Sequence, residues 1–255
     1  MKNILVTGST GVLGAALINE FKDTNVIMTD LDIVQLEELK LSLKLKYPTN
    51  NYFTFATNLS IENELTNLIK FIKETFNSLD LVINNAAITG ANDSDGYVTK
   101  LENQSLSSFK KAIDVNLVAP FFICQQLYPL LIEAKKPKII NIASIYGLQT
   151  SRPTLYQDTL MESPAAYEAS KAGLIQLTKY FAARYAPKIL VNAIAPGGIF
   201  RNQNKLFLDR YIENVPLKRM AELQEITNAV NWLSSDKTDY ITGQVLQIDG
   251  GLGIW

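Results

Sequence analysis

Short apolar runs alternate with longer amphipathic segments along this chain. The runs have the length and composition of buried strands and occupy residues 4–7, 25–29, 52–56, 79–83, 138–143, 189–194 and 245–248. Apolar positions recur at helical spacing over 62–76 and 107–134 and from Tyr167 onward, and Pro120 predicts a kink in the second of these helices. This alternation predicts an α/β fold, a Rossmann-type doubly wound parallel sheet of about seven strands with helices on both faces.

The composition is that of one globular domain. The 255 residues are 47% hydrophobic and 19% charged, and no linker or low-complexity tract divides them, so we predict a single domain over 1–255. The balance of 24 basic and 25 acidic residues gives no sign of nucleic-acid binding. No apolar run reaches membrane-spanning length or has the form of a signal core. We therefore expect a cytoplasmic protein that does not associate with membranes.

Two scarce residue types exclude several chemistries. A single cysteine, Cys124, excludes an internal disulfide. The absence of histidine excludes a Ser-His-Asp triad and a zinc site. We predict no metal centre.

Glycines at the first predicted strand–helix junction indicate a dinucleotide site. Gly8, Gly11 and Gly14 would let backbone amides approach a diphosphate, which the amino terminus of the next helix attracts; a plain glycine turn is the alternative. Asp30 ends the second strand, 22 residues after Gly8, where a carboxylate can bind the adenosine ribose hydroxyls. No Arg or Lys follows Asp30 closely, so a 2′-phosphate would be repelled. We predict NAD in preference to NADP.

Tyr167, Lys171 and Ser144 carry the candidate chemistry. Tyr167 and Lys171 are four residues apart at the start of an apolar-periodic segment, so on a helix their side chains point the same way. An ammonium group beside a phenol favours the phenolate, which lowers the pKa of the phenol and suits it to acid–base work near neutral pH. Ser144 follows the strand 138–143, so its hydroxyl is expected at the carboxyl edge of the sheet, where such folds bind ligands. Taken alone, Tyr-x-x-x-Lys also occurs on helices by chance.

The order of these motifs resembles that of the short-chain dehydrogenase/reductase family over nearly the whole chain. The matching segments are the cofactor loop at 7–14, the Asn-Asn-Ala-Gly motif at 84–87, the helix Asn at Asn116, the catalytic Ser144, Tyr167 and Lys171, the Pro-Gly pair Pro196-Gly197, and the carboxyl-terminal signature at 242–244 and 249–251. Six motifs in the right order make chance agreement a poor explanation.

The resemblance implies roles for these residues. Tyr167 would exchange a proton with the substrate oxygen, Ser144 would stabilise that oxygen, and Lys171 would bind the nicotinamide ribose and lower the pKa of the Tyr. Asn116 would hold a water that links Lys171 to solvent. Besides Tyr167 and Lys171, the cofactor would contact Gly8, Thr10, Gly11, Val12, Leu13, Gly14, Asp30, Asn58, Leu59, Asn85, Ala86, Ala87, Pro196, Gly197, Gly198 and Ile199. Family members pair two helices across a dimer axis, so a homodimer or homotetramer is expected.

Four features depart from the family pattern. The spacing Gly-x-x-Gly-x-x-Gly is commoner in nucleotide-sugar epimerases, which keeps an epimerase-like enzyme as an alternative, although the chain lacks their extra carboxyl-terminal region. Asn58 replaces the Asp that faces adenine, and Ala87 replaces a Gly. Ser144 and Tyr167 are 23 residues apart, which leaves about ten extra residues within 148–163 to loop over the site.

This insertion, 148–163, and a lid near 197–215 are placed to contact substrate. Arg152 and Tyr156 in the insertion and Arg201 in the lid are the candidate substrate residues. We predict that Arg152 and Arg201 converge with Lys205 and Arg210 on an anionic group such as a sugar phosphate, the alternative being plain surface charge.

The amino-acid sequence around the insertion is similar to that of dehydrogenases in bacterial surface-sugar pathways, namely those of flagellin glycosylation and legionaminic acid synthesis. This resemblance implies an NAD(P)-dependent oxidoreductase that transfers hydride between nicotinamide and a carbonyl or secondary alcohol of a small, anionic sugar or sugar phosphate. A sensor or scaffold that binds NAD without turnover is the competing class. The intact Asn116, Ser144, Tyr167 and Lys171 favour the enzyme.

Overall fold

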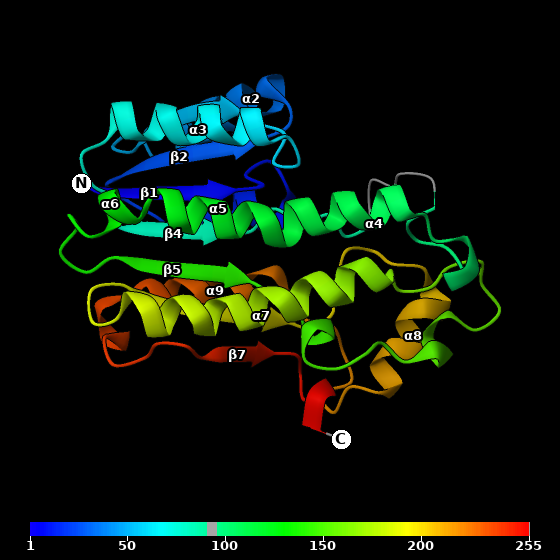
Figure 1. The fold of residues 1–255 in the computed structure, drawn as a ribbon. Helices are drawn as coiled ribbons and strands as arrows, with labels where there is room; N and C mark the ends of the chain where they lie inside the picture. Colours follow the sequence, from blue (N-terminus) through cyan, green and yellow to red (C-terminus); the bar gives the residue numbers. More distant parts are fainter. Residues whose placement is uncertain (91–95, 255) are drawn as a thin grey trace.

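The centre of the protein is one parallel sheet, seen in a computed structural model that describes residues 1–90 and 96–254 (Figure 1). Its order is β3-β2-β1-β4-β5-β6-β7, and every neighbouring pair is parallel. The strands are β1 (Lys2–Thr7), β2 (Thr24–Asp30), β3 (Asn51–Ala56), β4 (Leu81–Asn84), β5 (Lys138–Ile142), β6 (Leu190–Pro196) and β7 (Val245–Ile248). The predicted doubly wound sheet is confirmed, and its order reverses between β1 and β4, where such folds form a ligand crevice.

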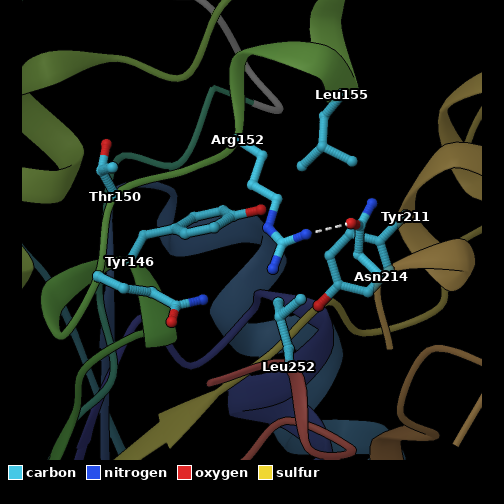
Figure 2. Close-up of a pocket in the computed structure, with 8 residues that line it drawn as sticks. Tyr146, Thr150, Arg152, Leu155, Tyr211, Asn214 and Leu252 are labelled. Carbon is cyan, nitrogen blue, oxygen red and sulfur yellow. Dashed lines mark hydrogen bonds between the residues drawn. The ribbon is translucent and has the colours of Figure 1, made fainter. Parts of the chain in front are cut away.

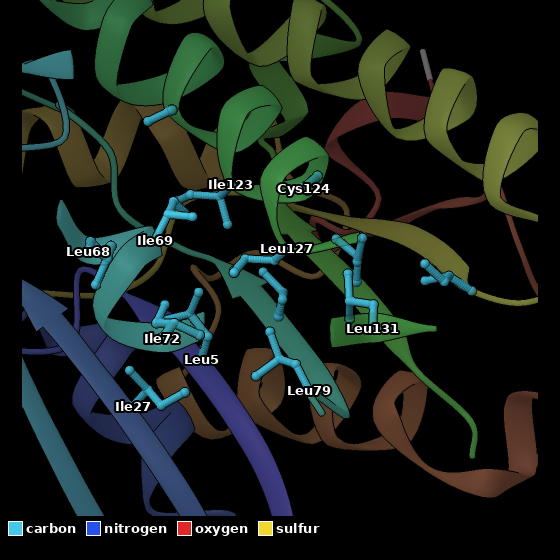
Figure 3. Close-up of a cluster of buried hydrophobic side chains, with 14 of the residues drawn as sticks. Leu5, Ile27, Leu68, Ile69, Ile72, Leu79, Ile123, Cys124, Leu127 and Leu131 are labelled. Atoms are coloured by element: carbon cyan, nitrogen blue, oxygen red, sulfur yellow. The ribbon is translucent and has the colours of Figure 1, made fainter. Parts of the chain in front are cut away.

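Helices cover both faces of this sheet (Figure 1). One face carries α3 (Glu62–Thr75), α5 (Ala119–Gln126) and α7 (Ala165–Tyr185), and the other carries α1 (Val12–Ile18), α2 (Ile33–Lys46) and α9 (Leu223–Ser234). On the first face Leu68, Ile123 and Leu127 meet in a cluster of buried side chains (Figure 3). The strands are apolar on both sides because both faces are covered. No helix in the described part of the chain is both long enough and apolar enough to cross a membrane.

The helix predicted over 107–134 is broken into four pieces. α4 (Leu106–Ile113) runs into a π-helical turn, Asp114–Val118, which is followed by α5 and by the short α6 (Tyr128–Leu131). This turn lies just before Pro120, which is in the first turn of α5, and the kink near Pro120 stays a prediction. Proline has no N–H to give to the carbonyl four residues earlier, and the Ala119 amide instead bonds to Asp114, five residues back.

The insertion and the lid lie together beyond the carboxyl ends of the strands (Figure 1). The insertion contains a 3₁₀ turn, Pro153–Tyr156, and the lid contains α8 (Lys205–Glu213). The two segments share an apolar cluster that includes Leu155, Tyr211 and Val215. The insertion is therefore packed against the lid rather than projecting freely into solvent.

Candidate active site

The structure brings Ser144, Tyr167 and Lys171 together at the carboxyl edge of the sheet. Ser144 directly follows Ala143 at the end of β5, while Tyr167 and Lys171 lie one turn apart near the start of α7. Gly147 allows the approach, because a Cβ there would be 2.6 Å from the Lys171 carbonyl carbon. Only glycine lets the turn after Ser144 pack this closely on α7.

Burial sets the proton affinities of this group. Lys171 is 2% exposed, and burial lowers its pKa to about 7. Its Nζ donates a hydrogen bond to the Ile142 carbonyl at 2.6 Å and lies 5.7 Å from the centre of the Tyr167 ring.

The prediction that Lys171 lowers the pKa of Tyr167 is wrong for this structure. Burial raises the pKa of the Tyr167 phenol, and the opposing, lowering effects come from Ser144 and Arg201. The reason is that Lys171 is itself buried and partly neutral near pH 7, so its attraction for a phenolate is weak.

Asn116 is held inside the π-helical turn and is fully buried. Its Oδ1 accepts from the Ile88 amide at 2.7 Å, and its Nδ2 donates to the Ser170 hydroxyl at 3.0 Å. The side chain thereby joins the segment after β4 to the helix that carries Tyr167. Its role in holding a water stays a prediction.

The glycine loop between β1 and α1 is tightly folded. Gly8 has a φ of +66°, and a Cβ on Gly14 would be 2.0 Å from the Gly8 carbonyl oxygen. Gly11 and Val12 at the start of α1 are exposed. The first amides of a helix have no acceptor within the helix, so this turn offers free donors to an anion.

Asp30 ties this loop to the end of β2. Its Oδ2 accepts from the Thr10 amide at 2.9 Å and from the Thr10 hydroxyl at 2.7 Å, and its Oδ1 accepts from the Leu31 amide. A carboxylate has about four acceptor positions, so one remains for a ribose hydroxyl. Asp30 thus has a structural role that is compatible with the predicted one.

The other predicted cofactor residues follow neighbouring strands at the same edge. Asn85 donates from its side chain to the Thr7 and Gly8 carbonyls, and the Ala86 amide donates to the Thr7 hydroxyl. Asn58 accepts from Ser60, while Leu59 is packed in the core and has only its backbone to offer a ligand. The remaining positions in this set are Leu13, Ala87, Pro196, Gly197, Gly198 and Ile199.

The predicted convergence of four cations on one anion is wrong. On α8, Lys205 pairs with Asp209 at 2.6 Å, and Arg210 pairs with Asp158 at 3.3 Å. Arg152 donates to the Asn214 side chain, and Arg201 is exposed on the lid. The carboxylates Asp209 and Asp158 neutralise two of the four cations.

The structure places several further side chains beside the predicted ones. Tyr146, Tyr211 and Asn214 line a cavity with Arg152 under the insertion (Figure 2), and Tyr156 packs against Phe207 of α8. Glu168, next to Tyr167, accepts from Thr150 and Ser151 and so anchors the insertion to α7. Apolar residues recur at helical spacing near α8, at Phe207, Leu208, Tyr211, Ile212 and Val215. This pattern is a signal by which α8 and Tyr211 could have been predicted from the sequence.

Two comparisons place this geometry among known proteins. The chain matches the family described as enoyl-(acyl carrier protein) reductase over residues 13–253. A Staphylococcus epidermidis protein named 3-oxoacyl-[acyl-carrier-protein] reductase FabG is 31% identical over 258 aligned positions, which cover 98% of each chain.

Solved structures agree with the sequence comparisons. A 4-hydroxyisoleucine dehydrogenase complexed with NADH is 31% identical, with a TM-score of 0.85 over 100% of both chains. A short chain dehydrogenase from Leptospira borgpetersenii with bound NAD+ is also 31% identical, with a TM-score of 0.82 over 99% of this chain and 92% of that one. This protein therefore belongs to the short-chain dehydrogenase/reductase family and is an oxidoreductase that uses a nicotinamide cofactor.

Proposed function

We propose that this protein is an NAD-dependent enzyme that interconverts a secondary alcohol and a carbonyl on a sugar or sugar phosphate, in the synthesis of a surface glycan. The observation that carries the proposal is the meeting of Ser144, Tyr167 and Lys171 beside the glycine loop at the carboxyl edge of the sheet.

The side chains divide the chemistry between them. When bound, a nicotinamide supplies or accepts the hydride. The Tyr167 hydroxyl gives a proton to the carbonyl oxygen in reduction and takes one from the alcohol in oxidation. The Ser144 hydroxyl donates a hydrogen bond to the same oxygen and stabilises the charge that develops on it. Lys171 orients the ribose, and its pKa of about 7 suits it to pass protons near neutral pH.

The residues around the glycine loop fit NAD better than NADP. Asp30 is the last residue of β2, where the adenosine ribose of a dinucleotide lies in this fold. A 2′-phosphate there would meet carboxylate charge. The residues from Gly8 to Gly14 include no Lys or Arg that would compensate.

The sugar assignment is supported by this chain's own features. The relatives above act, by name, on acyl-carrier-protein thioesters and on 4-hydroxyisoleucine. What supports a sugar here is the resemblance of the segments around the insertion to those of surface-sugar dehydrogenases, together with the polar and tyrosine side chains that line the cavity under the insertion. A 3-oxoacyl thioester is the second candidate substrate, supported by the end-to-end 31% identity to FabG.

One assay separates these candidates. The absorbance of reduced nicotinamide is followed with NAD and NADP against free sugars, sugar phosphates, nucleotide sugars and a 3-oxoacyl thioester, with Tyr167→Phe as the inactive control. We expect turnover with a sugar or sugar phosphate. Turnover of the thioester alone would refute the sugar proposal. NADH binding with no turnover of any substrate would show that the protein is a sensor that binds the cofactor without catalysis. An epimerase would convert a nucleotide sugar without net change in absorbance.

We also propose that the protein forms a homodimer or homotetramer through α5 and α7. Phe121 and Tyr180 are 37% and 49% exposed and both rings lie against Phe181. Leu127, just after α5, and Leu174 and Phe181 on α7 are buried in the core and are not available to a partner. Light scattering is expected to give an oligomeric mass for the wild type and a smaller mass for Phe121→Asp.

A further inference from the structure

A cavity beneath the insertion contains a guanidinium group that is not neutralised. Its walls include Tyr146 from the turn after β5, Arg152 from the insertion and Asn214 from the end of α8 (Figure 2). Arg152 is half-buried and donates to the Asn214 side-chain oxygen. Within residues 1–90 and 96–254 it forms no ion pair. A guanidinium has five N–H donors in a planar fork, so most of its donors are available.

Tyr146 contributes a second unused polar group to the same cavity. Its hydroxyl is buried and has no hydrogen-bond partner among the residues that the structure describes. Figure 2 shows this hydroxyl pointing toward the Arg152 guanidinium. Buried hydroxyls are nearly always hydrogen-bonded, so an acceptor that reaches both groups would satisfy Tyr146 and Arg152 together.

Neighbouring charges distinguish Arg152 from the other cations of this region. Arg210 is paired with Asp158 and Lys205 with Asp209. Glu168 faces Tyr146 from α7, but its carboxylate accepts from the Thr150 hydroxyl at 2.9 Å and the Ser151 amide at 3.2 Å. Its negative charge is thus partly compensated, and it does not pair with Arg152.

We propose that Arg152 and Tyr146 bind an oxyanion, a phosphate or carboxylate carried by the substrate. This inference rests on the proposed function and names where the anionic group of that substrate binds. Tyr146 is two residues after Ser144, so the subsite adjoins the reacting centre and would fix the distance from the anion to the carbon that is oxidised or reduced. The planar guanidinium suits both oxyanions, because it can bond to two of their oxygens at once.

The shape of the cavity indicates how an anion would arrive. The enclosed part has room for about one water molecule. One oxygen of the oxyanion would therefore enter this space and reach both Tyr146 and Arg152, while the rest of the substrate stays outside the cavity and extends toward Tyr167. Asn214 holds the guanidinium in place through the hydrogen bond already present.

Binding of inorganic phosphate tests the subsite without any need for turnover. Calorimetric titrations are made with saturating NADH, so that the glycine loop is filled, on the wild type, Arg152→Gln, Tyr146→Phe and the matched control Arg210→Gln. We expect Arg152→Gln to bind phosphate about tenfold more weakly or worse, because charge-assisted hydrogen bonds are lost. Tyr146→Phe keeps the ring packing and is expected to bind a few-fold more weakly, and Arg210→Gln is expected to bind as the wild type does. A parallel titration with acetate tells a carboxylate site from a phosphate site.

Three results would overturn the proposal: no phosphate or acetate binding by the wild type, unchanged binding by both cavity variants, or an equal loss in Arg210→Gln. If Arg152→Gln fails to fold in a thermal melt, Tyr146→Phe alone decides. With a turned-over sugar in hand, Arg152→Gln is expected to raise KM for the phosphorylated form by a larger factor than KM for the unphosphorylated form. Phosphate binding that depends on Arg152 in a protein that oxidises no sugar would refute the proposed function and leave the subsite standing.

Discussion

The side-chain amide of Asn141 donates a hydrogen bond of 2.8 Å to the hydroxyl of Thr178 in the interior between β5 and α7. Asn141 in turn accepts from Asn84 of β4, and the Thr178 hydroxyl donates to the Leu174 carbonyl. This buried polar chain crosses two strands and reaches the helix that carries Tyr167. It fixes the position of α7 along its axis, and its rotation about that axis, relative to β5, the strand that leads to Ser144.

Removing the Thr178 hydroxyl is expected to destabilise the fold. Thr178→Val preserves the shape of the side chain but leaves a buried Asn141 donor without a partner, which costs about 1–3 kcal/mol. Thr178→Ser retains the hydroxyl and is the matched control. Urea denaturation gives the free energies of unfolding, and equal values for Thr178→Val and the wild type would show that the chain of hydrogen bonds adds nothing to stability.

Lys171 is expected to make the stability of the protein rise with pH. Its pKa is lowered to about 7 in the folded state, so between pH 7 and about 10 the unfolded chain binds a proton that the folded chain does not. The resulting penalty on the folded state is about 5 kcal/mol below pH 7, and it disappears as the pH rises past 10.

A methionine at this position tests that penalty. Lys171→Met cannot ionise, so its advantage in unfolding free energy over the wild type should be largest at and below pH 7 and should shrink steadily toward pH 10. Denaturation of both proteins across this pH range measures the difference. A difference that does not change with pH would contradict a lowered pKa for Lys171.

Arg201 is expected to tune the base in the oxidation direction. Its charge lowers the pKa of Tyr167, while burial raises it. Arg201→Gln should therefore displace the rise of kcat/KM for alcohol oxidation to higher pH, whereas Arg201→Lys should leave it nearly in place. Superimposable pH profiles for Arg201→Gln and the wild type would show that the lid charge does not act on the phenol.

Tyr167→Phe should lose about 10²- to 10⁴-fold in rate, the usual contribution of a general acid or base.

The parts of the fold that the sequence predicted are those whose apolar pattern matches their environment. The strands of a covered parallel sheet are mostly apolar, and all seven strands of this sheet were predicted. α2 was missed because leucines alternate with polar residues over Leu39–Leu45, a period that is typical of a strand. The alternation persists in a helix because Leu41 and Leu45 are exposed and only Leu36 and Leu43 are buried.

A similar division holds for the site. Tyr167 and Lys171 could be paired from the sequence because they are neighbours on one helix turn. Whether a cation is neutralised by an ion pair depends on residues far away in the chain. Arg210 and its partner Asp158, for example, are 52 positions apart. The pKa of Tyr167 likewise depends on burial by the surrounding fold, which no local spacing reveals.

Asp30 is expected to set the preference for NAD. Asp30→Asn retains an oxygen that can accept from Thr10 but removes the charge that would face a 2′-phosphate. Relief of one charge repulsion at a few ångströms is worth about 1–4 kcal/mol, so kcat/KM with NADP should rise by about tenfold or more. Asp32→Asn is the control, because that carboxylate is exposed and caps the Val34 amide at the start of α2. Steady-state kinetics with both cofactors measures the preference, and an equal gain in the two variants would show that Asp30 has no special place in cofactor selection.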